Sequence, residues 1–352
     1  MTEIPKPDFS PHPLVRNAHI QSILASSALR KSSLLSRASG MVAASEELIL
    51  HAGVEEGEEI RLQGFLSRPA QRAGRPGPLA DHLVVMLHGW EGSANSNYML
   101  DAGDLLWRQG YTVCRLNFRD HGDTHHLNPG IFHSCRLDEV VRAIGSLVDQ
   151  VKPRHLFLAG FSLGGNFSLR VALRAPAAGL NIRHLVAVSP VISPHNGLRA
   201  IETAPWFYSY YFMRKWRRSL RRKAELFPQH QRVSSMLKAD MRELTALLVE
   251  NYTEFPDLDA YLDGYSVAGS RLQDLQVPAT IITARDDPVI PLEDFHRLML
   301  PASTRTVLTH HGGHCGFIES LDFGSWIPGF IADTLARHAD AEPLAGDPAI
   351  VN

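Results

Sequence analysis

The fold of this 352-residue chain is decided by His155–Ala159 (HLFLA), which leads directly into Gly160–Gly164 (GFSLG). HLFLA is a short apolar run typical of a buried strand. The segment after GFSLG, Gly165–Arg174, has a helical pattern that stops at Pro176. A sharp turn from strand to helix needs glycines two positions before and two after Ser162, because side chains there would collide with neighbouring backbone. The alternative is a glycine-rich packing turn without a chemical role.

Apolar runs alternate with helical patterns on both sides of this turn. Further strands are predicted at Glu46–His51, Glu59–Leu66, Leu83–Leu87, Tyr111–Phe118, His184–Ser189, Ala279–Ala284 and Arg305–Thr309. Further helices are predicted at Tyr98–Gln109, Leu137–Val151 and Ile327–Ala336. Such alternation is typical of an α/β fold with a mostly parallel central sheet flanked by helices. We expect a single domain over residues 1–337, followed by a disordered tail over residues 338–352.

The segment from about residue 191 to 276 interrupts this alternation. Its pattern is helical, aromatic at first and then strongly basic. An insertion of this length between two core strands predicts a helical cap over the carboxyl edge of the sheet, where open α/β sheets bind their ligands.

Two carboxylates and a cluster of histidines follow the last two predicted strands. Of the pair Asp286 and Asp287, we favour Asp287 because the proline after it stiffens the turn; the alternative is an aspartate that only caps the next helix. Among the histidines we favour His314, which has glycines on both sides, over His310 at the strand end and His311 at the start of the turn.

The order of these residues along the chain is informative. Serine 162, Asp287 and His314 occur in the order of the α/β-hydrolase catalytic triad, which differs from the order in other serine hydrolase folds. This order predicts Ser162 as the nucleophile, His314 as the base and Asp287 as the residue that orients it. The backbone N–H groups of Trp90 and Leu163 are predicted to bind the oxyanion, each contributing about 3 kcal/mol. His88, beside Trp90, is expected to be structural.

Several segments outside the turn resemble the YheT-like branch of the α/β-hydrolases, relatives of eukaryotic abhydrolase-domain esterases and phospholipases. They are Pro13–Ser22 (PLVRNAHIQS), His88–Ser93 (HGWEGS), Asn117–Arg119, Ile131–Ser134, Gly160–Asn166, Asp286–Pro288 and Gly313–Phe317. The chain departs from the branch at Asp120-His121 and at Cys135, where glycine is expected. The resemblance implies a carboxylesterase acting on short- to medium-chain acyl esters or lipid-like esters, with no cofactor.

Composition excludes few functions. The formal net charge of −2 gives no argument for a nucleic-acid partner. The three cysteines form no CxxC pair and are typical of a reduced compartment, and neither a signal peptide nor a membrane-spanning stretch is evident, so we expect a cytoplasmic protein. The sequence gives no indication of oligomeric state.

Other reactive residues are expected to have ordinary uses. The run His121, Asp123, His125 and His126 suggests a metal site, but we favour either lining of a pocket or plain solvation and expect no metal ligands. Arg119 is expected to form a surface ion pair, and contact with a substrate is the alternative. Cys315 is not expected to act as a nucleophile.

The run Arg214–Lys223 holds seven basic residues in ten. We favour a solvated helix face whose charges pair with acids elsewhere in the cap; the alternative hypothesis is contact with an anionic membrane or a phosphorylated headgroup. The cap aromatics Trp206, Phe207, Tyr210 and Tyr211 are candidates either for an acyl-chain pocket or for packing within the cap. An acyltransferase using the same acyl-enzyme and a non-catalytic binding protein on the same fold both stay open.

Overall fold

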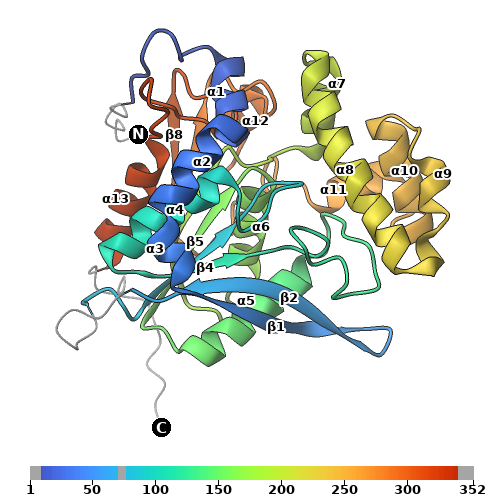
Figure 1. The fold of residues 1–352 in the computed structure, drawn as a ribbon, viewed down its shortest axis with the longest axis horizontal. Coiled ribbons are helices and arrows are strands. Elements are labelled where there is room, and N and C mark those ends of the chain that lie inside the picture. Colours follow the sequence, from blue (N-terminus) through green and yellow to red (C-terminus); the bar gives the residue numbers. More distant parts are fainter. Residues whose placement is uncertain (1–8, 70–76, 340–352) are drawn as a thin grey trace.

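A computed structural model describes residues 9–69 and 77–339 (Figure 1). The strands are β1 Ser45–Glu55, β2 Glu58–Ser67, β3 His82–Leu87, β4 Thr112–Leu116, β5 His155–Phe161, β6 Ile182–Val188, β7 Ala279–Ala284 and β8 Thr304–Thr309. They form one eight-stranded sheet in the order β1-β2-β4-β3-β5-β6-β7-β8. The pairs β1–β2 and β2–β4 are antiparallel and all later neighbours are parallel, so the predicted mostly parallel sheet is confirmed.

Helices cover both faces of this sheet. Those in the main layers and at the N-terminal side are α1 Ala18–Ser26, α2 Ala28–Arg37, α3 Ser39–Ala43, α4 Asn97–Gln109, α5 Leu137–Val151, α6 Leu163–Arg174, α12 Leu292–His296 and α13 Ile327–Ala339. The central strand β3 shows the alternation of a strand buried on both sides. Its Leu83, Val85 and Leu87 join the core with α5 and α6, whereas Val84 and Met86 join the core with α4 and α13.

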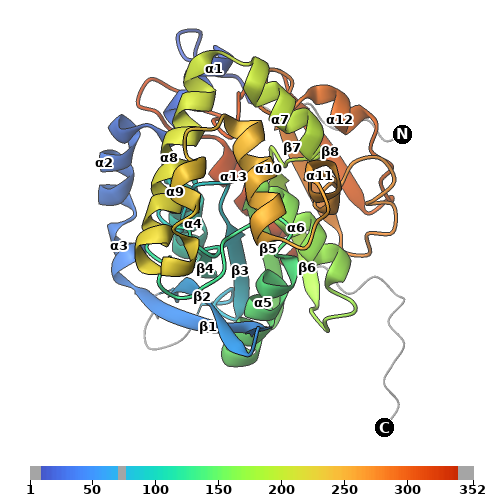
Figure 2. The ribbon, with the colours of Figure 1, turned by 90° about the vertical axis from the view of Figure 1, so that its right-hand side faces the viewer.

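The insertion between β6 and β7 consists of α7 Pro194–Thr203, α8 Trp206–Leu226, a 3₁₀ turn Pro228–His230, α9 Val233–Met236, α10 Met241–Tyr252 and α11 Leu258–Gly264. These helices, called the cap from here on, stand beside the sheet in Figure 1 and in front of it in Figure 2. They share a hydrophobic core of their own, which includes Met213, Leu220, Leu244 and Val249. The predicted helical insertion is therefore confirmed.

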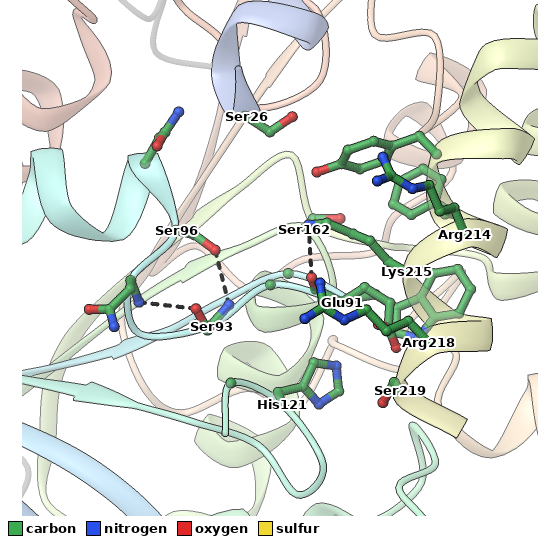
Figure 3. Close-up of a pocket in the computed structure, with 18 of the residues that line it drawn as sticks. Ser26, Glu91, Ser93, Ser96, His121, Ser162, Arg214, Lys215, Arg218 and Ser219 are labelled. Atoms are coloured by element: carbon green, nitrogen blue, oxygen red, sulfur yellow. Dashed lines mark hydrogen bonds between the residues drawn. The ribbon is translucent and has the colours of Figure 1, made fainter. Parts of the chain in front are cut away.

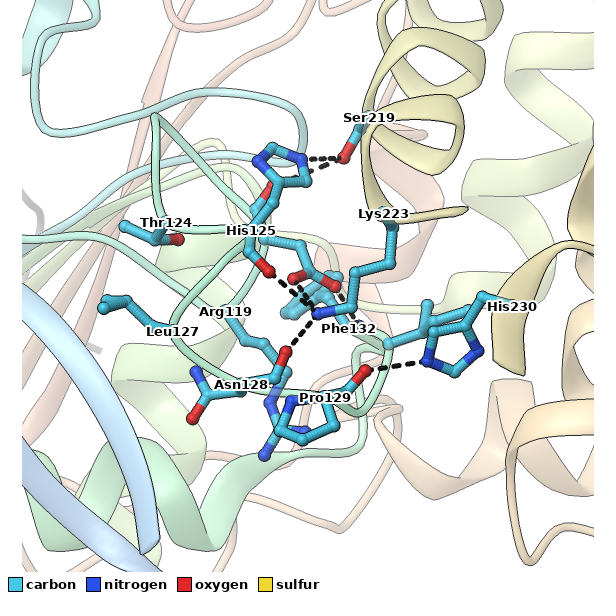
Figure 4. Close-up of polar contacts among 12 residues, drawn as sticks. Arg119, Thr124, His125, Leu127, Asn128, Pro129, Phe132, Ser219, Lys223 and His230 are labelled. Atoms are coloured by element: carbon cyan, nitrogen blue, oxygen red, sulfur yellow. Dashed lines mark hydrogen bonds and ion pairs between the residues drawn. The ribbon is translucent and has the colours of Figure 1, made fainter. Parts of the chain in front are cut away.

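A buried lysine fastens the cap to the loop after β4 (Figure 4). The side chain of Lys223 is 1% exposed, and its Nζ lies 2.7 Å from Asp120 Oδ1. The same ammonium donates to the carbonyl oxygens of His125 and Asn128. His125 also meets Ser219 of α8 at 2.8 Å, so the cap and this loop are joined at several points.

Three expectations need correction. Arg119 is not at the surface: its side chain is fully buried and forms ion pairs with Glu139 and Glu55. The charges of the basic run do not pair with acids elsewhere in the cap, because only Arg222 meets a cap acid, and Lys223 of this run is buried against Asp120. Helix α13 continues through Ala339, two residues into the predicted tail; residues 340–352 lie outside the described part of the chain.

Candidate active site

The turn between β5 and α6 holds Ser162 in a conformation that few non-glycine residues adopt. Its φ is +53°, and its N–H donates to the carbonyl of Val188 at 2.8 Å. A Cβ at Gly160 would lie 2.2 Å from the carbonyl oxygen of Gly164, and a Cβ at Gly164 would lie 2.2 Å from that of Leu87. Both glycines are therefore required by backbone contact, as the sequence predicted.

Three residues from separate loops form one chain of hydrogen bonds. Nε2 of His314 lies 2.9 Å from Ser162 Oγ, and Nδ1 of His314 lies 2.9 Å from Asp287 Oδ2. The side chain of Asp287 is fully buried, and its Oδ1 accepts the N–H groups of Val289 and Ile290 at 2.8 and 3.0 Å. The carboxylate is thus fixed by its own turn, and both of its oxygens face the imidazole, with Oδ2 closer to His314 Nδ1 than Oδ1, which lies 3.2 Å away.

The residues next to Asp287 and His314 in the sequence do not join this chain of hydrogen bonds. Asp286 faces away from the imidazole at 314: its Oδ1 accepts the Gly313 N–H at 2.9 Å and its Oδ2 lies 3.4 Å from His311 Nδ1. His310 is exposed. Cys315 is buried, with its thiol 3.9 Å from the carbonyl of Val188, and burial raises its pKa.

The N-terminal segment has a role that the residue patterns did not predict. The side chain of Gln21 is buried and bonds the backbone of Ile318 through both its amide nitrogen and its oxygen. Ser22 Oγ accepts the N–H of His314 at 2.8 Å. Helix α1 therefore braces the loop that carries the imidazole, which explains why Gly313 and Gly316 have no room for a side chain against α1. The resemblance at Pro13–Ser22 was the only sign of this contact.

The predicted oxyanion donors lie next to the serine. Leu163 is the first residue of α6, so its N–H has no intrahelical partner. Among the described residues, the N–H groups of Trp90 and Leu163 donate to no other group, whereas that of Gly89 is taken by the Tyr98 hydroxyl. A Cβ on Gly89 would lie 3.2 Å from Ser162 Cβ, so this loop passes directly beside the nucleophile position.

His88 has the structural role expected for it. Its Nδ1 lies 2.8 Å from the carbonyl oxygen of Gly89, and its Nε2 accepts the N–H of Phe118 at 3.2 Å. Complete burial lowers its pKa to about 4, so the imidazole is neutral near pH 7. It fixes the loop that carries Trp90.

Two cavities meet at Ser162. The larger, of about 1170 Å³, is bounded by α1, α2, the loop at His88–Ser93 and α8 (Figure 3). His314 lines this larger cavity. The smaller, of about 130 Å³, lies toward α7, α10 and α11, and Leu163 lines it. Phe207, Tyr210 and Tyr211 of the predicted aromatic set border the larger cavity. Trp206 borders neither cavity and is 75% exposed.

The histidine-rich loop after β4 also borders the larger cavity. His121, Asp123, His125 and His126 all line it, as expected. His121 Nδ1 lies 2.8 Å from the carbonyl oxygen of Arg119, and burial lowers the pKa of His121 to about 3. Across residues 9–69 and 77–339, no group of three or more His, Cys, Asp or Glu side chains is placed to hold a metal ion.

The architecture and the turn at Ser162 match a known family. The family described as the alpha/beta hydrolase fold matches residues 82–321. The chain belongs to this α/β-hydrolase family. "Putative esterase YheT" of Escherichia coli strain K12 is 26% identical over 292 residues, covering 78% of this chain and 80% of YheT. Phospholipase ABHD3 of Mus musculus is 24% identical over 254 residues, covering 68% of this chain and 59% of ABHD3.

Solved structures show the same fold. An esterase of Pyrococcus furiosus superposes with a TM-score of 0.51 at 17% identity, covering 84% of this chain and 91% of the esterase. The acylaminoacyl peptidase of Pyrococcus horikoshii superposes with a TM-score of 0.53 at 12% identity, covering 86% of this chain and 43% of the peptidase. The chain is an α/β-hydrolase similar to YheT. In the described ranges, none of the helices combines the length and apolar character needed to cross a bilayer.

Proposed function

We propose that this protein is a serine hydrolase that cleaves carboxylic esters through an acyl-enzyme on Ser162. The observation that carries the proposal is the continuous chain of hydrogen bonds from Ser162 Oγ through His314 to the buried Asp287. A serine hydroxyl becomes a nucleophile when a positioned imidazole accepts its proton, and the imidazole needs a partner that holds it in the right tautomer.

The proposed reaction has two halves, formation of the acyl-enzyme on Ser162 and its hydrolysis by water, and His314 transfers the proton in both. His314 Nε2 takes the proton of Ser162 as Oγ bonds to the ester carbonyl carbon, and the carbonyl oxygen becomes an anion facing the Trp90 and Leu163 N–H groups. His314 then gives this proton to the departing alcohol oxygen as the ester C–O bond breaks. Water, losing a proton to His314, attacks the acyl-enzyme; collapse releases the acid and returns the proton to Ser162.

The names of the relatives support this proposal. YheT carries the name of an esterase, ABHD3 that of a phospholipase and the Pyrococcus furiosus protein that of an esterase. Each of these names describes hydrolysis of an ester bond.

The test is turnover of p-nitrophenyl esters together with labelling by a fluorophosphonate probe. We expect both in the wild type and neither in Ser162→Ala. Ser219→Ala is the matched control, because its hydroxyl borders the same cavity but bonds His125 rather than His314. Labelling that persists in Ser162→Ala would refute the assignment, and a wild type that neither turns over nor labels would favour a binding protein. Ester products formed with added ethanol or glycerol would favour the acyltransferase.

A further inference from the structure

The larger cavity carries an unusual number of basic side chains. Those that line it are Lys31, Arg214, Lys215, Arg218, Arg221 and Arg222. On α8, positions 214, 218 and 221 or 222 repeat at the spacing of one helix face, so this face of the cap looks into the cavity. Figure 3 shows Arg214, Lys215 and Arg218 reaching from α8 toward the side on which Ser162 and Glu91 lie.

Most of these charges have no acidic partner. Within the described chain, the guanidinium groups of Arg214, Arg218 and Arg221 form neither an ion pair nor a hydrogen bond, and all three residues are exposed. Lys215 Nζ donates to the carbonyl oxygen of Glu91 at 3.0 Å and lies 4.8 Å from the centre of the Tyr211 ring, so it has no acidic partner. Lys31 likewise bonds only a backbone carbonyl, that of Asn95.

The acids that line the same cavity offset little of this charge. Asp120 is paired with Lys223, and Glu225 lies 3.5 Å from Arg222. Burial raises the pKa of Glu91 to about 8, so this carboxyl is mostly neutral at pH 7. Asp123 is the one lining acid, among those described, that keeps an uncompensated charge. The cavity therefore has a positive field that favours an anion.

The smaller cavity has the opposite character. Its lining contains no Asp, Glu, Lys or Arg among the described residues and consists mainly of apolar and aromatic side chains, such as Leu198, Trp216 and Tyr265. His133 also lines it, but burial lowers the pKa of His133 to about 3 and leaves the ring neutral. Its 130 Å³ is below the roughly 300–1,000 Å³ of pockets that enclose drug-sized ligands, so it suits a short apolar group.

The position of His314 decides which half of an ester enters which cavity. The imidazole must protonate the departing alcohol oxygen, so the alcohol lies on the side of His314. His314 lines only the larger cavity, whereas Leu163, which offers an oxyanion donor, lines only the smaller one. The acyl group then occupies the small apolar cavity, and the alcohol extends toward α8.

We propose, resting on the function proposed above, that the substrate is an ester of a short acyl group with an alcohol that carries a phosphate or carboxylate, bound by Arg214 and Arg218. Guanidinium groups bind both anions through paired N–H donors, which gives geometry as well as charge. The recognition charge therefore lies on the leaving group and not on the acyl group.

Three dissolved esters test whether the arginines recognise a charge on the alcohol rather than on the acyl group. The acetyl ester of 4-hydroxybenzamide is neutral, the acetyl ester of 4-hydroxyphenyl phosphate carries its charge on the alcohol, and the succinyl ester of 4-hydroxybenzamide carries its charge on the acyl group. In Arg214→Gln/Arg218→Gln we expect kcat/KM for the alcohol-charged ester to fall about tenfold or more, because charge-assisted hydrogen bonds are lost. The other two esters should change by less than about twofold.

Arg232→Gln is the matched control, since Arg232 is exposed on the cap and lines neither cavity. We expect no change with any of the three esters. The wild-type advantage for the alcohol-charged ester should also shrink as salt is raised. Equal losses with all three esters, or a loss with the succinyl ester alone, would overturn the proposal. Serine-dependent turnover of the neutral ester without any charge preference would overturn this inference and leave the proposed function standing.

A free metabolite and a lipid headgroup both present such an anion, and one comparison separates binding in the cavity from contact of the basic face with a membrane surface. Short-chain phosphatidylglycerol dissolved as monomers is compared with vesicles of long-chain phosphatidylglycerol. Arginine-dependent hydrolysis of the dissolved ester supports a binding site in the cavity, whichever source is natural. Arginine-dependent activity on vesicles alone, with no preference among the dissolved esters, would overturn the proposal and assign the basic face to membrane contact.

Discussion

Replacing Asp287 by asparagine changes one atom of the site, and the structure predicts which way the new amide must face. Asp287 Oδ1 accepts two backbone N–H groups, those of Val289 and Ile290. An amide NH₂ at the Oδ1 position would point its hydrogens at the backbone N–H groups of Val289 and Ile290. The asparagine side chain is therefore expected to place its oxygen there. The NH₂ group therefore takes the place of Oδ2, 2.9 Å from His314 Nδ1, and is nearer to this nitrogen than the retained oxygen, whose position lies 3.2 Å away.

The magnitude follows from the tautomer that this amide imposes. An NH₂ group donates to Nδ1, so the neutral imidazole must carry its proton on Nε2, which faces Ser162 Oγ at 2.9 Å. The base then has no lone pair for the serine proton. The equivalent change in a serine protease lowers kcat by about 10⁴, or about 5.4 kcal/mol, and we expect a loss of this size in Asp287→Asn.

The assay is kcat on a p-nitrophenyl ester, with Asp286→Asn as the adjacent control. Asparagine at 286 can still accept the Gly313 N–H and loses only a contact with the half-buried His311, so its kcat should stay within about threefold of wild type. Urea denaturation checks that both variants fold. A loss below about tenfold in a folded Asp287→Asn, or equal losses in the two variants, would refute the reasoning.

Three further changes test the support around the site. Lys223→Met leaves the buried Asp120 carboxylate without its cation and should lower the free energy of unfolding by about 3–5 kcal/mol in urea denaturation, against less than about 0.5 kcal/mol for the exposed Arg221→Met. A loss below about 1 kcal/mol in Lys223→Met would contradict a stabilising role for this buried ion pair. Ser22→Ala removes the acceptor of the His314 N–H and should lower kcat about fivefold with KM little changed, and Ser22→Thr should restore it; no fall in kcat would exclude this positioning role. Glu91 has a pKa of about 8 in the fold against 4.5 in an unfolded chain. The unfolded carboxyl therefore ionises first, and this group makes stability fall by up to about 1.4 kcal/mol per pH unit as pH rises from 4.5 to 8. Urea titrations at several pH values should show that fall absent in Glu91→Gln, and identical pH slopes would contradict the assignment.

Much of the fold could be predicted because its determinants are local. Strand β7 and helix α5 have the predicted bounds, since each is a continuous apolar run or a clear amphipathic pattern between breakers. The turn at Ser162 could also be predicted, because the requirement for glycine at 160 and 164 arises from backbone atoms within the same strand–helix unit and from the adjacent strand.

The errors have one physical cause. Arginine and lysine are usually exposed, so Arg119 and Lys223 were assigned to the surface. Whether such a charge is buried depends on partners brought from elsewhere by the fold: Glu55 of β1 and Glu139 of α5 enclose Arg119, and Asp120 receives Lys223. No local pattern contains these pairings. The bracing of the His314 loop by Ser22 joins residues still farther apart along the chain, at a separation of 292 residues.

The two parts of the site differ in how firmly they are held, and this difference has a consequence for specificity. Ser162 is fixed by a strained turn, Asp287 by two backbone N–H groups and His314 by Ser22 and Asp287, all before any substrate arrives. Arg214 and Arg218, in contrast, are exposed and unpaired on the cap. Preorganisation favours the transition state, whereas long free side chains adapt to different ligands at a cost in conformational entropy. Substitutions on this face of α8 should therefore change which alcohol is accepted while leaving the chemistry at Ser162 intact.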